Sequence, residues 1–338
     1  MSKSILYSSP YHSVDISQQR FLITGGAGFI GSNIVEYLLT FNAGHVRVLD
    51  NLSNGYFSNI ERFVSNPRFE FIEGDIRDFD TCKNALDGID FVSHQAALGS
   101  VPRSIDNPIT SNDVNISGFL NMLVAAKESR ALTRFVYAAS SSTYGDSKVL
   151  PKVEGSEGKP LSPYAVTKVV NELYADVFSS IYSFHTVGLR YFNIFGPNQN
   201  PNNPYAAVIP IFCRQVINDE KITIFGDGVT SRDFTFVENA VQANILAMLS
   251  DNISKHEVIN IACGDQASLN EIVDLLKGIS GKENIEIEYS TERSGDVKHS
   301  KADISKARNL INYSPRYNFK EGLRVVYEWY SNSEIQKL

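Results

Sequence analysis

Three glycines near the N-terminus lie between an apolar segment and an amphipathic one. Residues 21–24 are predicted to form a buried strand, and residues 30–40 carry apolar side chains at helical spacing. Between them, Gly25, Gly28 and Gly31 follow a GxxGxxG pattern. In such a loop the first glycine permits a tight turn, the second lets the backbone approach a pyrophosphate, and the third lets the helix pack closely on the strand. Because the helix N-terminus also presents free N–H groups to an anion, the pattern predicts a dinucleotide-binding site.

A carboxylate follows these glycines where a ribose contact is expected. Asp50 ends the second predicted strand, about twenty residues beyond the glycine turn, and can accept hydrogen bonds from the adenosine ribose hydroxyls. Its negative charge would repel a 2′-phosphate, so we expect NAD rather than NADP as the cofactor. Asp75 and Ile76 close the third strand, where the adenine edge is expected, although a strand-end cap explains Asp75 nearly as well.

Short β-branched runs alternate with helical patterns along most of the chain, and the later strands are predicted at 46–50, 69–75, 91–97, 135–140, 186–191 and 258–262. Helices are expected between most of them, including 107–128 and 163–183. Strands that alternate with helices pair in parallel, so we expect an α/β fold with a doubly wound parallel (Rossmann) sheet. From about Phe195 the pattern loosens, which indicates a smaller, mostly C-terminal α/β lobe for the substrate. The strand near Val258 is expected to return to the main sheet.

The predicted domain organisation has three parts. Residues 1–19 form an N-terminal arm packed against the body. Residues 20–193 with 233–265 form the NAD-binding Rossmann domain, and residues 194–232 with 266–338 form the substrate-binding lobe.

Composition narrows the class of protein. The formal net charge of −7 gives no electrostatic help for binding nucleic acid or an anionic membrane. No apolar run reaches the roughly 18 residues of a spanning helix, and the first twenty residues lack the apolar stretch of a secretory signal. The three cysteines are widely spaced without a CxxC pair, which suggests neither a disulfide framework nor a zinc site. We therefore expect a cytoplasmic protein with no metal centre.

Two further segments carry groups suited to acid–base chemistry. A strand ends in SSSTYG at 140–145, and Ser162 with Pro163 marks the start of a helix that contains Tyr164 and Lys168. At i and i+4, these two side chains lie on one helix face. A lysine ammonium near the phenol is expected to lower the pKa of Tyr164 from about 10 towards neutral pH. Tyr164 is thus a candidate general acid or base for an alcohol, and a serine hydroxyl across the cleft can bind the same oxygen.

With these residues in place, the chain from Arg20 onward resembles the extended short-chain dehydrogenases/reductases, and within them the UDP-N-acetylglucosamine 4-epimerases. The resemblance rests on nine segments: TGGAGFIGS (24–32), DNLSNG (50–55), GDIRD (74–78), HQAALGSVPRS (94–104), SSSTYG (140–145), SPYAVTK (162–168), LRYFNIFGP (189–197), GDGVTSRDF (226–234) and RSGDVKHSKAD (293–303).

The resemblance implies a role for each matching position. The catalytic set would be Ser140, Tyr164 and Lys168, with Ser141 and Ser142 as alternatives for the serine. The NAD contacts would be Gly25, Gly28, Phe29, Ile30, Gly31, Asp50, Asn51, Ser53, Gly55, Asp75, Ile76, Gln95, Ala96, Ala97, Tyr164, Lys168 and Tyr191. The UDP-sugar contacts would be Gly99, Ser100, Ser141, Ser142, Asn193, Ala207, Val208, Phe225, Arg232, Arg293, Asp296 and Ser300, with the two arginines holding the diphosphate.

The implied reaction is reversible 4-epimerisation through a 4-keto sugar with tightly bound NAD. Relatives that are 4,6-dehydratases carry an acidic residue beside the catalytic serine or threonine, and UDP-glucuronate decarboxylases carry a glutamate in the same region. This chain has Ser141 and Ser142 there. Epimerases restricted to UDP-glucose and UDP-galactose carry a bulky tyrosine where this chain has Ser300, which leaves room for an N-acetyl group. We therefore expect interconversion of UDP-GlcNAc and UDP-GalNAc.

Three alternatives stay open from the sequence. The substrate could be UDP-glucose/UDP-galactose, or a UDP-hexuronic acid read by a basic residue such as Arg103. A non-catalytic NAD-binding regulator is the alternative from another class, since fold alone does not fix function.

The resemblance also implies a homodimer, paired through a four-helix bundle of the 107–128 and 163–183 helices. The apolar pattern Ile116, Leu120, Leu123 and Val124 permits this, but would equally serve packing on the sheet.

Overall fold

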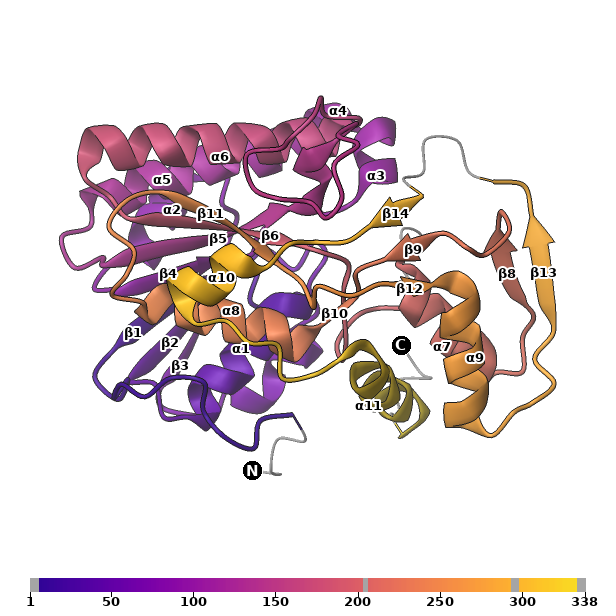
Figure 1. Ribbon diagram of the computed structural model, residues 1–338. Coiled ribbons are helices and arrows are strands. Elements are labelled where there is room, and N and C mark those ends of the chain that lie inside the picture. Colours follow the sequence, from indigo (N-terminus) through magenta and orange to yellow (C-terminus); the bar gives the residue numbers. More distant parts are fainter. Residues whose placement is uncertain (1–5, 203–205, 293–297, 333–338) are drawn as a thin grey trace.

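A parallel sheet of seven strands forms the centre of the protein, and the computed structural model describes residues 6–202, 206–292 and 298–332 (Figure 1). The strand order is β3-β2-β1-β4-β5-β6-β11, and every neighbouring pair is parallel. The bounds are β1 Arg20–Thr24, β2 His45–Asp50, β3 Phe69–Glu73, β4 Phe91–His94, β5 Arg134–Ser140, β6 Thr186–Tyr191 and β11 Glu257–Ile261. The predicted doubly wound parallel sheet is confirmed, and the strand near Val258 joins it beside β6.

Two of the predicted strands are too long. β3 ends at Glu73 rather than 75, and β4 ends at His94 rather than 97. The residues that follow, 74–76 and 95–97, turn away at the carboxyl edge of the sheet. There they line a cleft instead of pairing with a neighbouring strand.

Helices cover both faces of the sheet (Figure 1). One face carries α2 (Phe79–Ala85), α5 (Phe119–Glu128) and α6 (Pro163–Tyr182), and the other carries α1 (Phe29–Thr40), α8 (Val237–Leu249) and α10 (Ser305–Ile311). The single helix predicted over 107–128 is instead divided into α4 (Pro108–Asn112), a π-helical turn (Asp113–Gly118) and α5. In that turn the Asn115 side chain donates to the carbonyl of Leu98 and accepts from its N–H, which ties the helix to the loop after β4. A short helix, α3 (Val101–Asp106), follows that loop.

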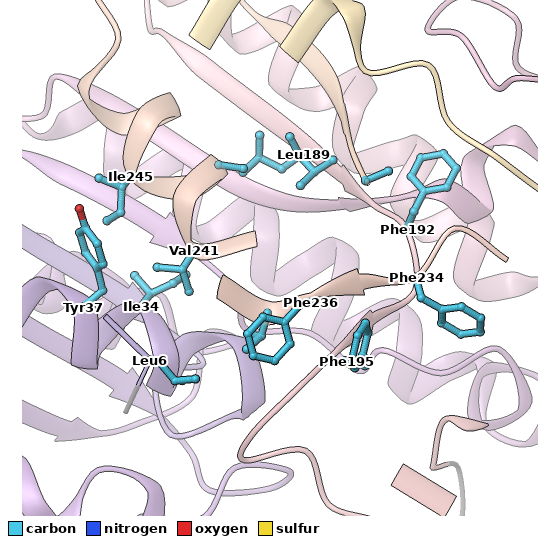
Figure 2. Close-up of a cluster of buried hydrophobic side chains, with 14 of the residues drawn as sticks. Leu6, Ile34, Tyr37, Leu189, Phe192, Phe195, Phe234, Phe236, Val241 and Ile245 are labelled. Atoms are coloured by element: carbon cyan, nitrogen blue, oxygen red, sulfur yellow. The ribbon is translucent and has the colours of Figure 1, made fainter. Parts of the chain in front are cut away.

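One apolar cluster joins the face of the sheet that α1, α8 and α10 cover to later parts of the chain (Figure 2). Ile34 of α1 and Val241 of α8 pack beneath the sheet, and the aromatic rings of Phe195 and Phe236 continue the cluster beyond it, 5.7 Å apart. Each such fully buried side chain stabilises the fold by about 1.5–3 kcal/mol. Phe195 also contacts Phe319, at the start of α11 (Phe319–Asn332). The sheet and the C-terminal helix therefore share one core.

A second lobe lies at the carboxyl end of the sheet (right in Figure 1). It contains α7 (Val208–Ile217), α9 (Leu269–Ser280) and the parallel pair β8 (Ile222–Phe225) and β13 (Ile287–Ser290). A small sheet, β12-β9-β14, connects it to the main body, with bounds Ala267–Ser268, Ser231–Arg232 and His299–Ser300, and β7 (Ile194–Phe195) pairs with β10 (Thr235–Phe236). The buried Asp233 carboxylate accepts N–H groups from Cys263, Gly264 and Ala302, so it fixes the three segments around this small sheet.

The N-terminal residues that the structure describes pack on α1. The Tyr7 hydroxyl donates to the carbonyl of Asn33, and the ring of Tyr11 stacks on Tyr37 with centroids 4.9 Å apart. Arg316 then donates to the carbonyl of Pro10 and lies over the Tyr11 ring. In the described part of the chain, no helix is long and apolar enough to cross a membrane.

Candidate active site

A cleft of about 1040 Å³ lies at the carboxyl edge of the sheet, between the main body and the second lobe. It opens where the chain leaves β1 and β4 in opposite directions, which is where open parallel sheets bind ligands. Its volume is at the upper end of the range for small-molecule sites, as a dinucleotide together with a second nucleotide would require.

The glycine turn lines the cleft, and residues larger than glycine would not fit at two of its positions. Gly25 has a φ of +66°, and a Cβ on it would lie 2.7 Å from the backbone nitrogen of Ala96. A Cβ on Gly31 would lie 2.2 Å from the carbonyl oxygen of Gly25, so this glycine lets α1 pack against the turn. The α1 N-terminus begins at Phe29, directly behind the turn, and its free N–H groups suit a pyrophosphate.

The carboxylates expected near the adenosine lie at the ends of β2 and β3. Asp50 is buried and accepts N–H groups from Ala27 and Leu52, which fixes its orientation, and burial raises its pKa. Asp75 accepts hydrogen bonds from Arg77 and Asn51, and chiefly because of Arg77 its pKa is lowered to about 2. Both side chains line the cleft, and Asp50 retains acceptor capacity for ribose hydroxyls.

Three side chains at the cleft wall are joined by hydrogen bonds. The Tyr191 hydroxyl donates to the Gln95 side chain at 3.2 Å and accepts from Asn244 Nδ2 at 2.7 Å. Gln95 Nε2 in turn donates to Asn244 Oδ1, so all three side chains are held in place. Every residue assigned to NAD from the sequence lines this cleft: Gly25, Gly28, Phe29, Ile30, Gly31, Asp50, Asn51, Ser53, Gly55, Asp75, Ile76, Gln95, Ala96, Ala97, Tyr164, Lys168 and Tyr191.

The candidate catalytic groups converge from β5 and α6. Ser162 caps α6 by accepting the N–H of Ala165, and its first turn presents Tyr164 to the cleft. Lys168 follows one turn later, buried, with its Nζ donating to the carbonyl of Ala138 at 2.8 Å. Ser140 lies at the end of β5, where its Oγ accepts from Ser142 Oγ at 2.9 Å. The three side chains therefore meet in one part of the cleft.

The expectation that Lys168 lowers the pKa of Tyr164 was wrong. Burial raises the pKa of Tyr164, and a hydrogen bond with Ser140 only partly opposes this. The ammonium of Lys168 lies 5.8 Å from the centroid of the tyrosine ring and is bound to a backbone carbonyl. Burial also lowers the pKa of Lys168, to about 8. Desolvation outweighs the attraction that helical spacing suggests.

The residues assigned to the UDP-sugar divide into three groups. Eight line the cleft: Gly99, Ser100, Ser141, Ser142, Asn193, Ala207, Arg232 and Ser300. Val208 and Phe225 do not line it: Val208 begins α7 and packs on the core, and Phe225 ends β8 and is exposed. Arg293 and Asp296 lie outside the described residues. Ser300 pairs directly with Arg232 in the parallel register of β14 and β9, so the predicted sugar contact lies beside the predicted diphosphate contact.

Several residues that line the cleft could not be identified from the sequence, because no motif contains them. Asn200 Nδ2 donates to the Tyr56 hydroxyl at 2.6 Å, which joins the loop after β2 to the segment before α7. Lys152 and Leu161 belong to the long connection between η4 (Ser141–Tyr144) and α6. Two other short 3-10 turns, η1 (Phe57–Asn59) and η2 (Glu61–Phe63), follow Tyr56. The described residues contain no cluster of His, Cys, Asp or Glu able to hold a metal ion.

Known proteins match almost the whole chain. The family described as GDP-mannose 4,6 dehydratase matches residues 22–326. The chain belongs to the extended short-chain dehydrogenase/reductase family. A UDP-N-acetylglucosamine 4-epimerase from Methanobrevibacter ruminantium, solved with UDP-N-acetylmuramic acid, is 38% identical with a TM-score of 0.87, covering 95% of this chain and 99% of that one.

Two further members of the family are similar over comparable lengths. A putative UDP-glucose 4-epimerase from Methanocaldococcus jannaschii is 37% identical over 314 residues, 92% of this chain and 98% of that protein. A UDP-glucuronic acid 4-epimerase from Bacillus cereus, solved with UDP-glucuronic acid and NAD, is 34% identical with a TM-score of 0.85, covering 94% and 99%. These family members differ in the sugar their names specify, so the choice of sugar depends on the residues of this cleft.

Proposed function

We propose that this protein interconverts UDP-GlcNAc and UDP-GalNAc by inverting C4 of the sugar, with NAD held in the cleft between reactions. The coarser assignment is that it is an NAD-dependent UDP-sugar 4-epimerase, as the matched epimerases indicate. The observation that carries the finer proposal is the pairing of Ser300 with Arg232 in the same cleft that Ser140, Tyr164 and Lys168 line. A small residue there leaves space for an N-acetyl group.

The chain's own groups would handle the proton and the diphosphate. When bound, NAD supplies an acceptor and donor of hydride for the sugar carbon. Tyr164 takes the proton of the 4-hydroxyl, and Ser140 hydrogen-bonds to the same oxygen. Arg232 would hold the diphosphate while the 4-keto sugar rotates in the cleft, so that the opposite face of the sugar would be presented to the cofactor. Tyr164 then gives the proton back, and the reaction involves no net oxidation.

The cleft does not support the loss of water that a dehydratase requires. The carboxylates of the described residues that line the cleft are Asp50, Asp75 and Asp106. The first two lie at the ends of β2 and β3 and the third ends α3, whereas the segment beside Ser140 consists of Ser141 and Ser142. A group able to protonate a leaving hydroxyl is therefore missing where the family's dehydratases carry one. Epimerisation fits these residues better.

Proton NMR of the purified protein with each UDP-sugar and no added NAD tests the function. We expect UDP-GlcNAc and UDP-GalNAc to approach the same equilibrium mixture from either side. Turnover that needs stoichiometric NAD, or that releases a ketone product, would contradict the proposal. Faster turnover of UDP-glucose than of the acetylated pair would overturn the choice of sugar alone.

Ser300→Tyr is expected to change the sugar preference. A tyrosine ring at this position in β14 would occupy the space assigned to the N-acetyl group, so kcat/KM for UDP-GlcNAc should fall at least about tenfold more than that for UDP-glucose, a difference worth about 1.4 kcal/mol. Ser300→Ala is the matched control, because it keeps the space and should leave the ratio within about twofold. Equal losses on both sugars with Ser300→Tyr would refute the steric argument.

The homodimer is also proposed, and the exposed face of α6 supports it. An apolar stripe at helical spacing includes Leu173, Val177 and Ile181, which are 61%, 50% and 65% exposed. Leu123 of α5, by contrast, is fully buried in the core on the face of the sheet that α2, α5 and α6 cover, so its apolar character serves packing. An exposed stripe of this kind is typical of a helix that pairs with a second copy.

Val177→Glu is expected to convert the dimer to a single chain of 37.6 kDa, measured by light scattering. The glutamate would place a charge in the centre of the apolar stripe and would be desolvated on pairing. Val64→Glu, at another exposed valine outside the stripe, is the matched control and should remain dimeric. An unchanged mass for Val177→Glu would place the interface elsewhere.

A further inference from the structure

Four polar side chains beside the cleft form a hydrogen-bond network around Asn244. Asn244 lies on α8, is fully buried and does not itself line the cleft. Its Nδ2 donates to the carbonyl of Ala240 at 2.8 Å and to the Tyr191 hydroxyl at 2.7 Å. Its Oδ1 accepts from Ser93 Oγ at 3.0 Å and from Gln95 Nε2 at 3.1 Å. Protein groups therefore occupy both donors and both acceptor positions of this amide.

The carbonyl of Ala240 fixes the direction of every hydrogen bond in this network. A backbone carbonyl can only accept, so the amide nitrogen of Asn244 must face it and the amide oxygen must face the other way. That oxygen requires donors, and Gln95 therefore presents Nε2 to it. The second hydrogen of Gln95 Nε2 goes to Ser93 Oγ at 2.9 Å. The Gln95 oxygen is then left to accept from the Tyr191 hydroxyl.

The two members of the network that line the cleft, Gln95 and Tyr191, can offer it only acceptors. Both hydrogens of the Gln95 amide are donated within the network, and so is the hydrogen of the Tyr191 hydroxyl. Burial raises the pKa of Tyr191 to about 12, so the hydroxyl keeps its proton at neutral pH. The two oxygens retain acceptor capacity. This part of the wall therefore suits a bound group that donates hydrogen bonds.

The position of Tyr191 indicates which part of a dinucleotide this wall meets. Tyr191 pairs directly with Ser140 in the register of β5 and β6, and Ser140 hydrogen-bonds to Tyr164. The ring that exchanges hydride with the sugar has to lie near Tyr164, because the proton and the hydride leave the same alcohol group. The pyrophosphate is expected at the α1 N-terminus instead. The nicotinamide is therefore the part nearest Tyr191, and the carboxamide supplies the only N–H donors on that ring.

We propose that Asn244 is a positioning residue that holds Gln95 and Tyr191 as hydrogen-bond acceptors for the carboxamide N–H group of the nicotinamide. The inference rests on the proposed function only for the presence of NAD in the cleft. Asn244 acts through the two side chains that it orients, since it does not reach the cleft itself. Its contribution is the choice between acceptor and donor at the wall, which a buried apolar residue at this position of α8 could not make.

The test compares binding of NAD with binding of 3-acetylpyridine adenine dinucleotide, in which a methyl group replaces the amide nitrogen and both N–H donors are lost. The purified full-length protein, with the NAD that it retains, is incubated with an excess of both dinucleotides at equal concentrations until the bound ratio is constant. The bound dinucleotides are then released by denaturation and measured by chromatography. We expect the unaltered protein to prefer NAD at least about tenfold, because the analogue leaves both acceptors unmatched.

Asn244→Leu keeps the size of the side chain and removes its donors and its acceptor. We expect the preference for NAD to fall below about threefold, because Gln95 and Tyr191 are then free to turn their own hydrogens towards the analogue. Gln95→Leu, which removes one acceptor directly, should lower the preference as well. The matched control, Gln242→Leu, removes another buried amide of α8 that lies outside the network and the cleft, and should change the preference less than about twofold.

The outcomes separate this inference from the proposed function, because the measurement needs no sugar. Equal binding of both dinucleotides by the unaltered protein overturns the inference and leaves the epimerase reaction in place. Equal losses of both in Asn244→Leu, with the ratio unchanged, also overturn it, because they indicate a purely structural role. Absence of epimerisation with the expected dinucleotide preference overturns the proposed function alone, and binding of neither dinucleotide contradicts both.

A second variant keeps the inference testable if Asn244→Leu fails to fold. Asn244→Ala removes the same hydrogen bonds without adding bulk, and it is measured in the same way. Loss of the preference for NAD in this variant supports the role of Asn244, and an unchanged preference overturns it.

Discussion

Tyr164→Phe is expected to lower kcat on UDP-GlcNAc by about 10²–10⁴-fold, which is the usual contribution of a positioned general acid or base. The substitution removes one oxygen and leaves the ring, so the packing of α6 and the cleft wall should change little. The buried hydroxyl would be the group that exchanges the proton with the sugar, and Ser140 hydrogen-bonds with it. The loss should appear in kcat more than in KM, since the proton transfer belongs to the transition state.

Tyr174→Phe is the matched control for this prediction. Tyr174 lies on the same helix, but it is partly exposed and does not line the cleft. We expect kcat within about twofold of the original for this variant, and retention of NAD in both. A Tyr164→Phe enzyme that keeps more than about a tenth of its turnover would contradict the assigned role. Loss of NAD from Tyr164→Phe would show that the hydroxyl serves cofactor binding instead.

The parts of the site that could be predicted from the sequence depend on neighbours along the chain. The spacing of Gly25, Gly28 and Gly31 is a property of one turn, and Tyr164 with Lys168 is a property of one helix. Local periodicity likewise predicts strands and helices, and a parallel sheet then follows from their alternation. The NAD-binding side of the cleft could therefore be predicted from these local features alone.

The features that could not be predicted depend on contacts between distant segments. Lys152 reaches the cleft only because its backbone pairs with residues near Ala302. The two-residue strands that place Arg232 beside Ser300 are too short to carry a periodicity. The pKa of Tyr164 depends on how deeply the side chain is buried, which helical spacing does not reveal. Sequence spacing indicates which groups are neighbours, and the surrounding fold determines their charge.

A second result with a large expected effect concerns the ion pairs of Arg190, which also lie outside the reach of local patterns. Arg190 of β6 donates through Nε and Nη2 to both carboxylate oxygens of Glu172, at 2.9 and 2.8 Å, and also pairs with Glu157. Its guanidinium is 5% exposed and lies 4.9 Å from the ring centroid of Tyr144, which lines the cleft. The pair therefore ties α6, which carries Tyr164 and Lys168, to the sheet.

Arg190→Met is expected to destabilise the protein by about 3–5 kcal/mol, because it leaves the largely buried carboxylate of Glu172 and the partly exposed carboxylate of Glu157 without their cation. In a chain of this size, the midpoint of thermal unfolding should fall by roughly 5–15 °C. Removing the charge at both ends of the bidentate pair, as Arg190→Met with Glu172→Gln, should recover part of the loss, since fewer unpaired charges then stay buried. Lys221→Met, which breaks the exposed pair with Glu288, should cost less than about 1 kcal/mol. If the single and double variants at Arg190 unfold at the same temperature, the stabilisation comes from the packing of Arg190 against Tyr144, and the ion pair itself contributes little.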